Sequence, residues 1–213
     1  MSETTTETPT RRALLVVDVQ NDFCEGGSLA VEGGLEVGRR ISEHLTENAG
    51  RYDVVVASRD WHHPDTTNRG HFAAEGEDPD YVDTWPVHCV AGTPGAEYAP
   101  TFDTSGVTHH VQKGQDLPAY SMFEGVTADG TTLADLLDAN GIDAVDVVGI
   151  ATDYCVRATA LDAVAGGREV TVFEDLVAAV AAATGAAARE ELTAAGATWR
   201  AAQTDGENEE THR

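Results

Sequence analysis

Short apolar runs alternate with stretches of helical periodicity along most of the chain. Four strong runs have the length of a strand, at 13–19 (ALLVVDV), 53–58 (DVVVAS), 144–150 (AVDVVGI) and 169–173, and weaker ones lie at 106–111 and 198–201. Because most of these runs show no polar alternation, they predict strands buried on both faces. The 3.6-residue spacing predicts helices over 35–49, 131–140, 154–165 and 184–195.

The order of these elements predicts the fold class. Strands separated by helices favour a doubly wound α/β fold, in which a parallel sheet of about six strands carries helices on both faces. We expect this domain to span 11–202, between a disordered tail at 1–10 and an acidic tail at 203–213. Ligands of such folds bind at the carboxyl ends of the strands. Candidate chemistry is therefore sought just after each strand and in the two long loops, 60–101 and 113–130.

The charge balance limits the partners of the protein. The chain has 13 basic and 37 acidic residues and a net charge of −24. This argues against nucleic acid and against an anionic membrane surface, since both bind cations. No apolar run approaches the roughly 20 residues of a membrane span, and the first residues show no signal peptide. Three cysteines are too few for a disulfide framework, so we expect a cytoplasmic protein. A homo-oligomer is compatible with the sequence.

Lysine is nearly eliminated from the chain. Twelve of the 13 basic residues are arginines, and Lys113 is the single lysine. Dense carboxylates with so little lysine are typical of a high-salt cytoplasm, where salt screens their repulsion; codon bias toward arginine and alanine is the alternative. Lys113 follows the third predicted strand, where a cation would stabilise a thiolate or a carboxylate. An ordinary solvated lysine is the alternative.

Two further residues at strand ends have the chemistry of a base and a nucleophile. Asp18 ends the first apolar run, where burial would raise its pKa toward the range of a general base, although a cap or loop acceptor is the alternative. Cys155 lies in the first turn of the helix after 144–150, where the helix dipole favours a thiolate and free N–H groups hold an oxyanion. An inert buried thiol is the alternative, and it is our interpretation of Cys24 and Cys89.

The loop after the second strand carries a carboxylate and several histidines. Asp60 and His62 are two positions apart in an extended segment and project to the same side, and His71 and His88 follow farther along. One carboxylate with two or three imidazoles is typical of a zinc, iron or manganese site. Solvated loop histidines are the alternative.

Several motifs, in order, resemble one family. They are LLVVDVQNDFCEGGSLAV (14–31), DWH (60–62), WPVHCVAGTPGAE (85–97), KG (113–114), YSMFEG (120–125) and VDVVGIATDYCVRATALDA (145–163). In these motifs the chain closely resembles the nicotinamidase/pyrazinamidase family, within the isochorismatase-like cysteine hydrolases. The resemblance implies a parallel sheet with helices on both faces, in agreement with the hydrophobic pattern.

The resemblance also implies a catalytic triad. Cys155 would be the nucleophile, Asp18 the proton acceptor and donor, and Lys113 the third member. The N–H groups of Ala151 and Cys155 would form the oxyanion hole, after a cis peptide bond between Ile150 and Ala151.

One divalent transition metal ion (zinc, iron or manganese) is implied as well. Asp60, His62 and His88 match the metal ligands of the family. His71 matches a fourth histidine that some members use, and His63 is its rival because the length of this loop varies. The resemblance further implies a substrate pocket, with walls formed by Phe23, Trp85, Tyr120, Ile150 and Tyr154, the last at a place where the family varies.

We therefore expect a metal-dependent cysteine amidohydrolase that converts nicotinamide to nicotinate and ammonia for NAD resynthesis, and that also cleaves pyrazinamide. Isochorismatases of the same superfamily lack the metal set, so Asp60, His62 and His88 favour the amide-cleaving branch. One alternative is a cysteine hydrolase of carbamoyl or ureide substrates, against which the aromatic walls and the metal set argue. The other is a non-catalytic metal- or ligand-binding protein, which would have no use for an intact triad.

Overall fold

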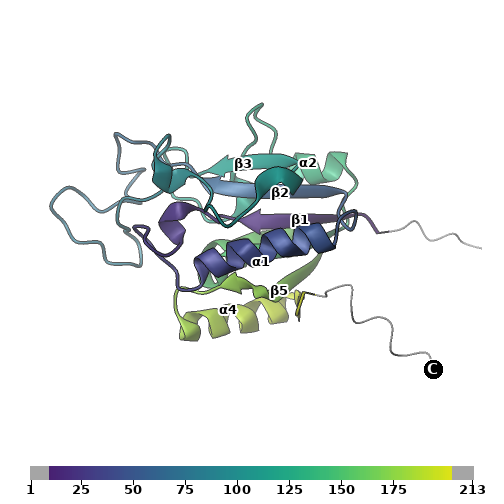
Figure 1. Cartoon of the computed structure of the whole chain (residues 1–213). Helices are drawn as coiled ribbons and strands as arrows, with labels where there is room; N and C mark the ends of the chain where they lie inside the picture. The colour runs from purple at the N-terminus through teal and green to yellow at the C-terminus, as the bar shows by residue number, and fades with distance from the viewer. Residues whose placement is uncertain (1–9, 203–213) are drawn as a thin grey trace, which may run out of the picture.

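The computed structural model describes residues 10–202, which form a six-stranded parallel sheet with helices on both faces (Figure 1). The strands are β1 (Arg12–Val17), β2 (Val54–Asp60), β3 (His109–Lys113), β4 (Ala144–Ile150), β5 (Glu169–Ala178) and β6 (Thr198–Arg200). Their order in the sheet is β3-β2-β1-β4-β5-β6, and all neighbours run parallel. The predicted doubly wound α/β fold is confirmed. Apart from residue 10, the tails predicted at 1–10 and 203–213 lie outside the described residues.

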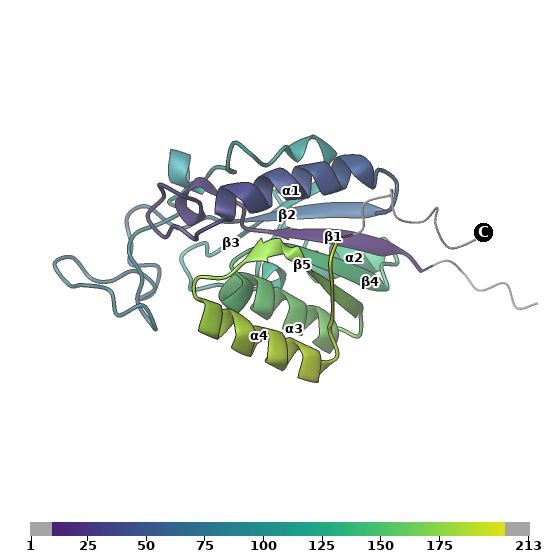
Figure 2. The same ribbon diagram turned by 60° about the horizontal axis from the view of Figure 1, so that its bottom comes forward.

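Within residues 10–202, four α-helices cover the two faces of the sheet. They are α1 (Gly34–Glu47), α2 (Leu133–Ala139), α3 (Arg157–Ala165) and α4 (Ala182–Ala195). Helix α1 lies on one face, and α3 and α4 lie on the other (Figure 2). Along β1, Leu15 and Val17 join the core under α2, α3 and α4, whereas Leu14 and Val16 join the core under α1. Both faces of the strand are thus buried, which explains its unbroken apolar run. Among the described residues, no helix combines the length and apolar character needed to cross a membrane.

Three elements have a boundary that differs from the prediction by more than two residues, whereas the others agree to within two. The third strand lies at His109–Lys113 rather than 106–111, because its polar sequence pairs with β2 through the backbone. Strand β5 continues to Ala178 rather than 173, since its second half pairs with the end of β4 after a register shift. A π-helical turn, Thr152–Val156, precedes α3. These differences arise from tertiary pairing, which the local pattern does not encode.

The switch point of the sheet lies between β1 and β4. The chain winds outward from this central pair in both directions, so the carboxyl ends of the two strands open a crevice. Gly149 brings them together: it has a φ of +113°, and a Cβ there would lie 2.1 Å from the carbonyl oxygen of Val17. A side chain would therefore push β4 away from the end of β1. The long loop between β2 and β3 projects from this same edge of the sheet (Figure 1).

Candidate active site

Asp18, Lys113 and Cys155 come together at the carboxyl ends of β1, β3 and β4. The ammonium nitrogen of Lys113 lies 2.8 Å from Oδ2 of Asp18 and 3.6 Å from Sγ of Cys155. It also donates to the carbonyl of Ala119 at 3.2 Å and pairs with Oδ1 of Asp60. The exposed fractions of Asp18, Lys113 and Cys155 are 0%, 1% and 7%. The structure therefore places a buried cation between two carboxylates and a thiol.

The pKa values of Lys113 and Asp18 depend on their burial and on the charges of the groups beside them. Burial would lower the pKa of Lys113, but the charges of Asp18 and Asp60 hold that pKa well above its ordinary value, so the ammonium stays charged. Burial raises the pKa of Asp18, and Lys113 opposes the shift. The sequence predicts this upward direction for a carboxylate at the end of an apolar run.

Cys155 lies in the π-helical turn that follows β4. Burial raises the pKa of its thiol well above the ordinary value; Lys113 lowers that pKa, while Asp18 and Asp60 raise it further. The raised pKa favours the neutral thiol, in contrast to the thiolate expected of a helix start, because burial outweighs the charge of Lys113. A base must therefore take the thiol proton before sulfur can attack.

Three imidazoles gather beside Asp60. One ring nitrogen from each of His62, His71 and His88 lies within 4.8 Å of the other two, and all three side chains are buried. Oδ2 of Asp60 lies 3.5 Å from Nε2 of His62 and 3.6 Å from Nε2 of His88. His63, the rival of His71, is exposed, and its Nδ1 accepts from a backbone N–H in its own loop. The described residues thus bring His71, and not His63, to the cluster.

The hydrogen bonds of these rings suit a metal ion. Nδ1 of His62 donates to the carbonyl of Gly114 at 2.9 Å, and Nδ1 of His88 donates to that of Pro86 at 2.8 Å, so these carbonyls orient both rings and their Nε2 atoms face Asp60. Nε2 of His62 is buried and has no hydrogen-bond partner within residues 10–202. Burial lowers the pKa of His71 to about 3, so this ring is neutral. Three converging imidazoles beside a carboxylate fit a divalent transition metal.

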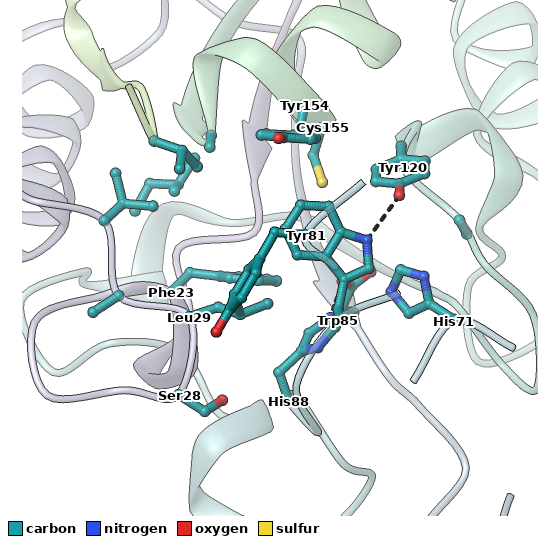
Figure 3. Close-up of a pocket in the computed structure, with 17 residues that line it drawn as sticks. Phe23, Ser28, Leu29, His71, Tyr81, Trp85, His88, Tyr120, Tyr154 and Cys155 are labelled. Carbon is teal, nitrogen blue, oxygen red and sulfur yellow. Dashed lines mark hydrogen bonds and ion pairs between the residues drawn. The ribbon is translucent and has the colours of Figure 1, made fainter. Parts of the chain in front are cut away.

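A pocket of about 270 Å³ lies between the thiol and the imidazoles, with Cys155 at one end and His71 and His88 at the other (Figure 3). All five residues that the resemblance implies as walls line it: Phe23, Trp85, Tyr120, Ile150 and Tyr154. Ala151 also lines the pocket, and the peptide bond that precedes it is cis.

The aromatic walls hold one another in place. Nε1 of Trp85 donates to the hydroxyl of Tyr120 at 3.1 Å, and the ring of Tyr154 meets that of Trp85 edge to face, with centroids 5.2 Å apart. Three separate chain segments are thereby joined into one wall. Edge-to-face pairs and a buried indole hydrogen bond are both stabilising.

Sequence reasoning missed several residues around the pocket. The side chain of Gln20 is buried; its Nε2 donates to the carbonyls of Asp60 and Ala96 at 2.9 and 2.8 Å, and its Oε1 accepts from the N–H of Asp60 at 2.8 Å. Ser58 donates to Oδ1 of Asp18 at 2.6 Å. Both are polar residues at the end of an apolar run, a signal that could have found them. Tyr81 lines the mouth of the pocket, and nothing in the sequence pattern pointed to it.

Comparison with known proteins identifies the family. The model of the isochorismatase domain matches residues 12–204. The nicotinamidase/pyrazinamidase of Mycobacterium tuberculosis is 52% identical over 184 residues, which cover 86% of this chain and 95% of that protein. The nicotinamidase of Escherichia coli is 38% identical over 179 residues, 77% of this chain and 81% of that protein. The structure of Pyrococcus horikoshii pyrazinamidase in complex with zinc superposes with a TM-score of 0.76 at 36% identity and covers 90% of this chain and 99% of that one. The chain therefore belongs to the nicotinamidase/pyrazinamidase family of isochorismatase-domain hydrolases.

Proposed function

We propose that this protein is a metal-dependent cysteine amidohydrolase that converts nicotinamide to nicotinate and ammonia. One observation carries the proposal: a single aromatic pocket has at one end the Cys155 thiol, next to the buried ammonium of Lys113 and carboxylate of Asp18, and at the other end a cluster of imidazoles. The names of the relatives, nicotinamidase and pyrazinamidase, support this substrate class.

The first half of the reaction forms a thioester. Asp18 takes the proton of the Cys155 thiol, and the thiolate attacks the carboxamide carbon. Lys113 keeps its charge throughout, and its ammonium, 3.6 Å from Sγ, stabilises the thiolate. The N–H groups of Ala151 and Cys155 hold the oxyanion, and Asp18 returns the proton to the nitrogen that leaves as ammonia.

The second half releases the acid. Asp18, again a carboxylate, takes a proton from a water molecule that attacks the thioester carbon. The tetrahedral intermediate collapses with loss of the sulfur, and Cys155 recovers its proton from Asp18. Nicotinate leaves, and the triad returns to its resting charges.

The imidazole cluster would hold one divalent transition metal ion through His62, His71, His88 and Oδ2 of Asp60. Such an ion, when bound, supplies a Lewis acid for the ring nitrogen of the substrate. Asp60 joins the two ends of the pocket, because its other oxygen pairs with Lys113. Zinc is the first ion to test, given the zinc in the solved pyrazinamidase; iron and manganese suit the same ligands.

Benzamide separates this proposal from its alternatives. Nicotinamide and pyrazinamide both carry a ring nitrogen, whereas benzamide has nearly the same shape without one. With metal present, we expect kcat/KM for benzamide to be lower by as much as roughly 10⁴-fold, because a site built for a polar partner rejects an analogue that lacks it. Removal of the metal with a chelator should lower kcat/KM for nicotinamide toward the value for benzamide. Equal rates for the two amides in the metal-loaded enzyme would favour a carbamoyl hydrolase, and no ammonia release from any amide would favour a binding protein.

The cellular setting follows from the reaction and the composition. Nicotinate is a precursor for NAD, so we place the enzyme in NAD resynthesis in a cytoplasm. The net charge of −24 supports a high-salt cytoplasm, with codon bias as the alternative.

A further inference from the structure

Ser58 is a buried hydroxyl that takes no part in the proton transfers described above. It lies in β2, two residues before Asp60, and its exposed fraction is 0%. Its Oγ lies 2.6 Å from Oδ1 of Asp18 and 3.2 Å from the backbone nitrogen of Asp18. Ser58 therefore touches both the main chain and the side chain of the proposed base.

The chemistry of the three groups fixes the direction of both hydrogen bonds. A carboxylate oxygen can only accept, so the single hydroxyl proton of Ser58 goes to Oδ1. The N–H of Asp18 can only donate, so it uses a lone pair of the same hydroxyl. Oδ1 is thereby held toward β2, and Oδ2 is left facing Lys113 at 2.8 Å.

The backbone explains why a side chain is needed here. The parallel pairing of β1 with β2 ends at Val16 and Ala57. Asp18 then turns away with a φ of +45°, in the left-handed region that few residues other than glycine adopt. Ser58 accepts the Asp18 N–H just beyond the end of this pairing, so a buried donor does not go unpaired.

We propose that Ser58 is a positioning residue for the general base: its hydroxyl holds Oδ1 of Asp18, so that Oδ2 alone receives the proton of Cys155. Without this hydroxyl, the carboxylate can rotate about its terminal bond between Lys113 and the space that Ser58 vacates. The proposal rests on the proposed function for its substrate, but not for the reactivity of the thiol.

The test compares Ser58→Ala and Ser58→Thr with the control Ser42→Ala. Ser42 lies in α1, outside the pocket lining; its hydroxyl accepts from the N–H of Asp103 and shares its proton between the carbonyls of Gly38 and Thr101. For each variant we would measure kcat and KM for nicotinamide, the rate of Cys155 alkylation by iodoacetamide with peptide mapping, and a thermal melt that gives the folded fraction. All rates are expressed per folded molecule.

We expect Ser58→Ala to lower kcat by about tenfold or more with KM within twofold, and to slow alkylation of Cys155 by a similar factor. Ser58→Thr keeps the hydroxyl and should recover most of both rates; if its extra methyl prevents folding, Ser58→Ala decides alone. The control should match the wild type. A kcat within twofold of wild type, or faster alkylation with kcat retained, would overturn the proposal. Absence of nicotinamide turnover in the wild type would instead contradict the proposed function, and the alkylation comparison would still stand.

Discussion

At the scale of single residues, Asp60 connects the two chemistries of the pocket. Its Oδ1 pairs with Lys113, and its Oδ2 faces His62 and His88. Burial would raise the pKa of Asp60, but Lys113 and the two imidazoles hold it well below the ordinary value, so the group remains a carboxylate. The ion-pair network and the imidazole cluster therefore share one anion, and a change at Asp60 would disturb both.

Removing the nucleophile or the base should abolish turnover. Cys155→Ala deletes the attacking sulfur, and Asp18→Asn deletes the acceptor of a proton that the neutral thiol does not lose by itself. We expect less than about a hundredth of wild-type kcat in each, since loss of a general base alone costs roughly 10²–10⁴-fold. Cys24→Ala is the matched control: burial raises the pKa of that thiol to about 12, and we expect full activity. Ammonia release at saturating nicotinamide, with a thermal melt for each variant, checks this, and higher residual activity would remove the residue from the triad.

Lys113→Arg should be damaging although it conserves charge. The ammonium donates to acceptors in three directions inside a fully buried space, whereas a guanidinium is larger, planar and matched to a flat pair of oxygens. We expect at least about a hundredfold loss of kcat in a folded protein. Steady-state kinetics beside circular dichroism measures it. Wild-type kcat in this variant would make Lys113 a bystander.

At the scale of elements, the ends of strands and the turns that follow them position the three proposed catalytic residues. Strand β1 delivers Asp18, β3 delivers Lys113, and the π-helical turn after β4 delivers Cys155. That turn is anchored from outside: Asp153 accepts from the N–H groups of Val180 and Ala181, just before α4. The segment that carries the nucleophile is thus tied to the chain that leads into α4.

The turn after β3 also positions a proposed metal ligand, and Gly114→Ala tests this. Gly114 has a φ of +74°, and a Cβ there would lie 2.6 Å from Cε1 of His62, so alanine should displace the ring and weaken its bond to the Gly114 carbonyl. We expect metal affinity to fall by about 10–100-fold, as for other losses of an outer-shell partner. Gly130→Ala is the control, since Gly130 has a φ of +86° and nothing within 4 Å of a Cβ. Competition with a chromogenic chelator measures both, and equal affinities would show that Gly114 does not set the position of His62.

At the scale of the whole molecule, charge is the dominant feature. With 37 acidic and 13 basic residues, most carboxylates have no cation to pair with. On the exposed face of α1, Arg39 pairs with Glu36 and Glu43, and Arg40 pairs with Glu36. Exposed pairs of this kind contribute little to stability, so they leave the overall repulsion in place.

The melting temperature should therefore rise strongly between dilute buffer and molar KCl. Like charges repel over about 30 Å at 0.01 M salt and over about 3 Å at 1 M. Thermal melts across this range measure the effect, and sucrose, which stabilises without screening, is the control. A flat dependence on KCl would favour codon bias over adaptation to high salt.

The sequence by itself determined the fold class and the identities of most chemical groups in the pocket. Its apolar runs mark the central strands, since a strand buried on both faces must be apolar throughout, and the family motifs include the catalytic candidates Asp18, Lys113 and Cys155. Their catalytic roles, and those of the proposed metal ligands, stay predictions.

Only the tertiary structure decided how these groups meet. It pairs Lys113 with two carboxylates at once and raises the pKa of the Cys155 thiol by burial. It also brings His71, rather than His63, to the other two imidazoles, and it places the Ser58 hydroxyl against the carboxylate of Asp18. The extra length of β5 also depends on tertiary structure, because its second half pairs with the end of β4. The physical reason is that the pattern of residues indicates only local backbone preference and burial. The order of strands in the sheet and the packing of the loops above it decide which distant segments meet. They also decide how strongly desolvation shifts a pKa.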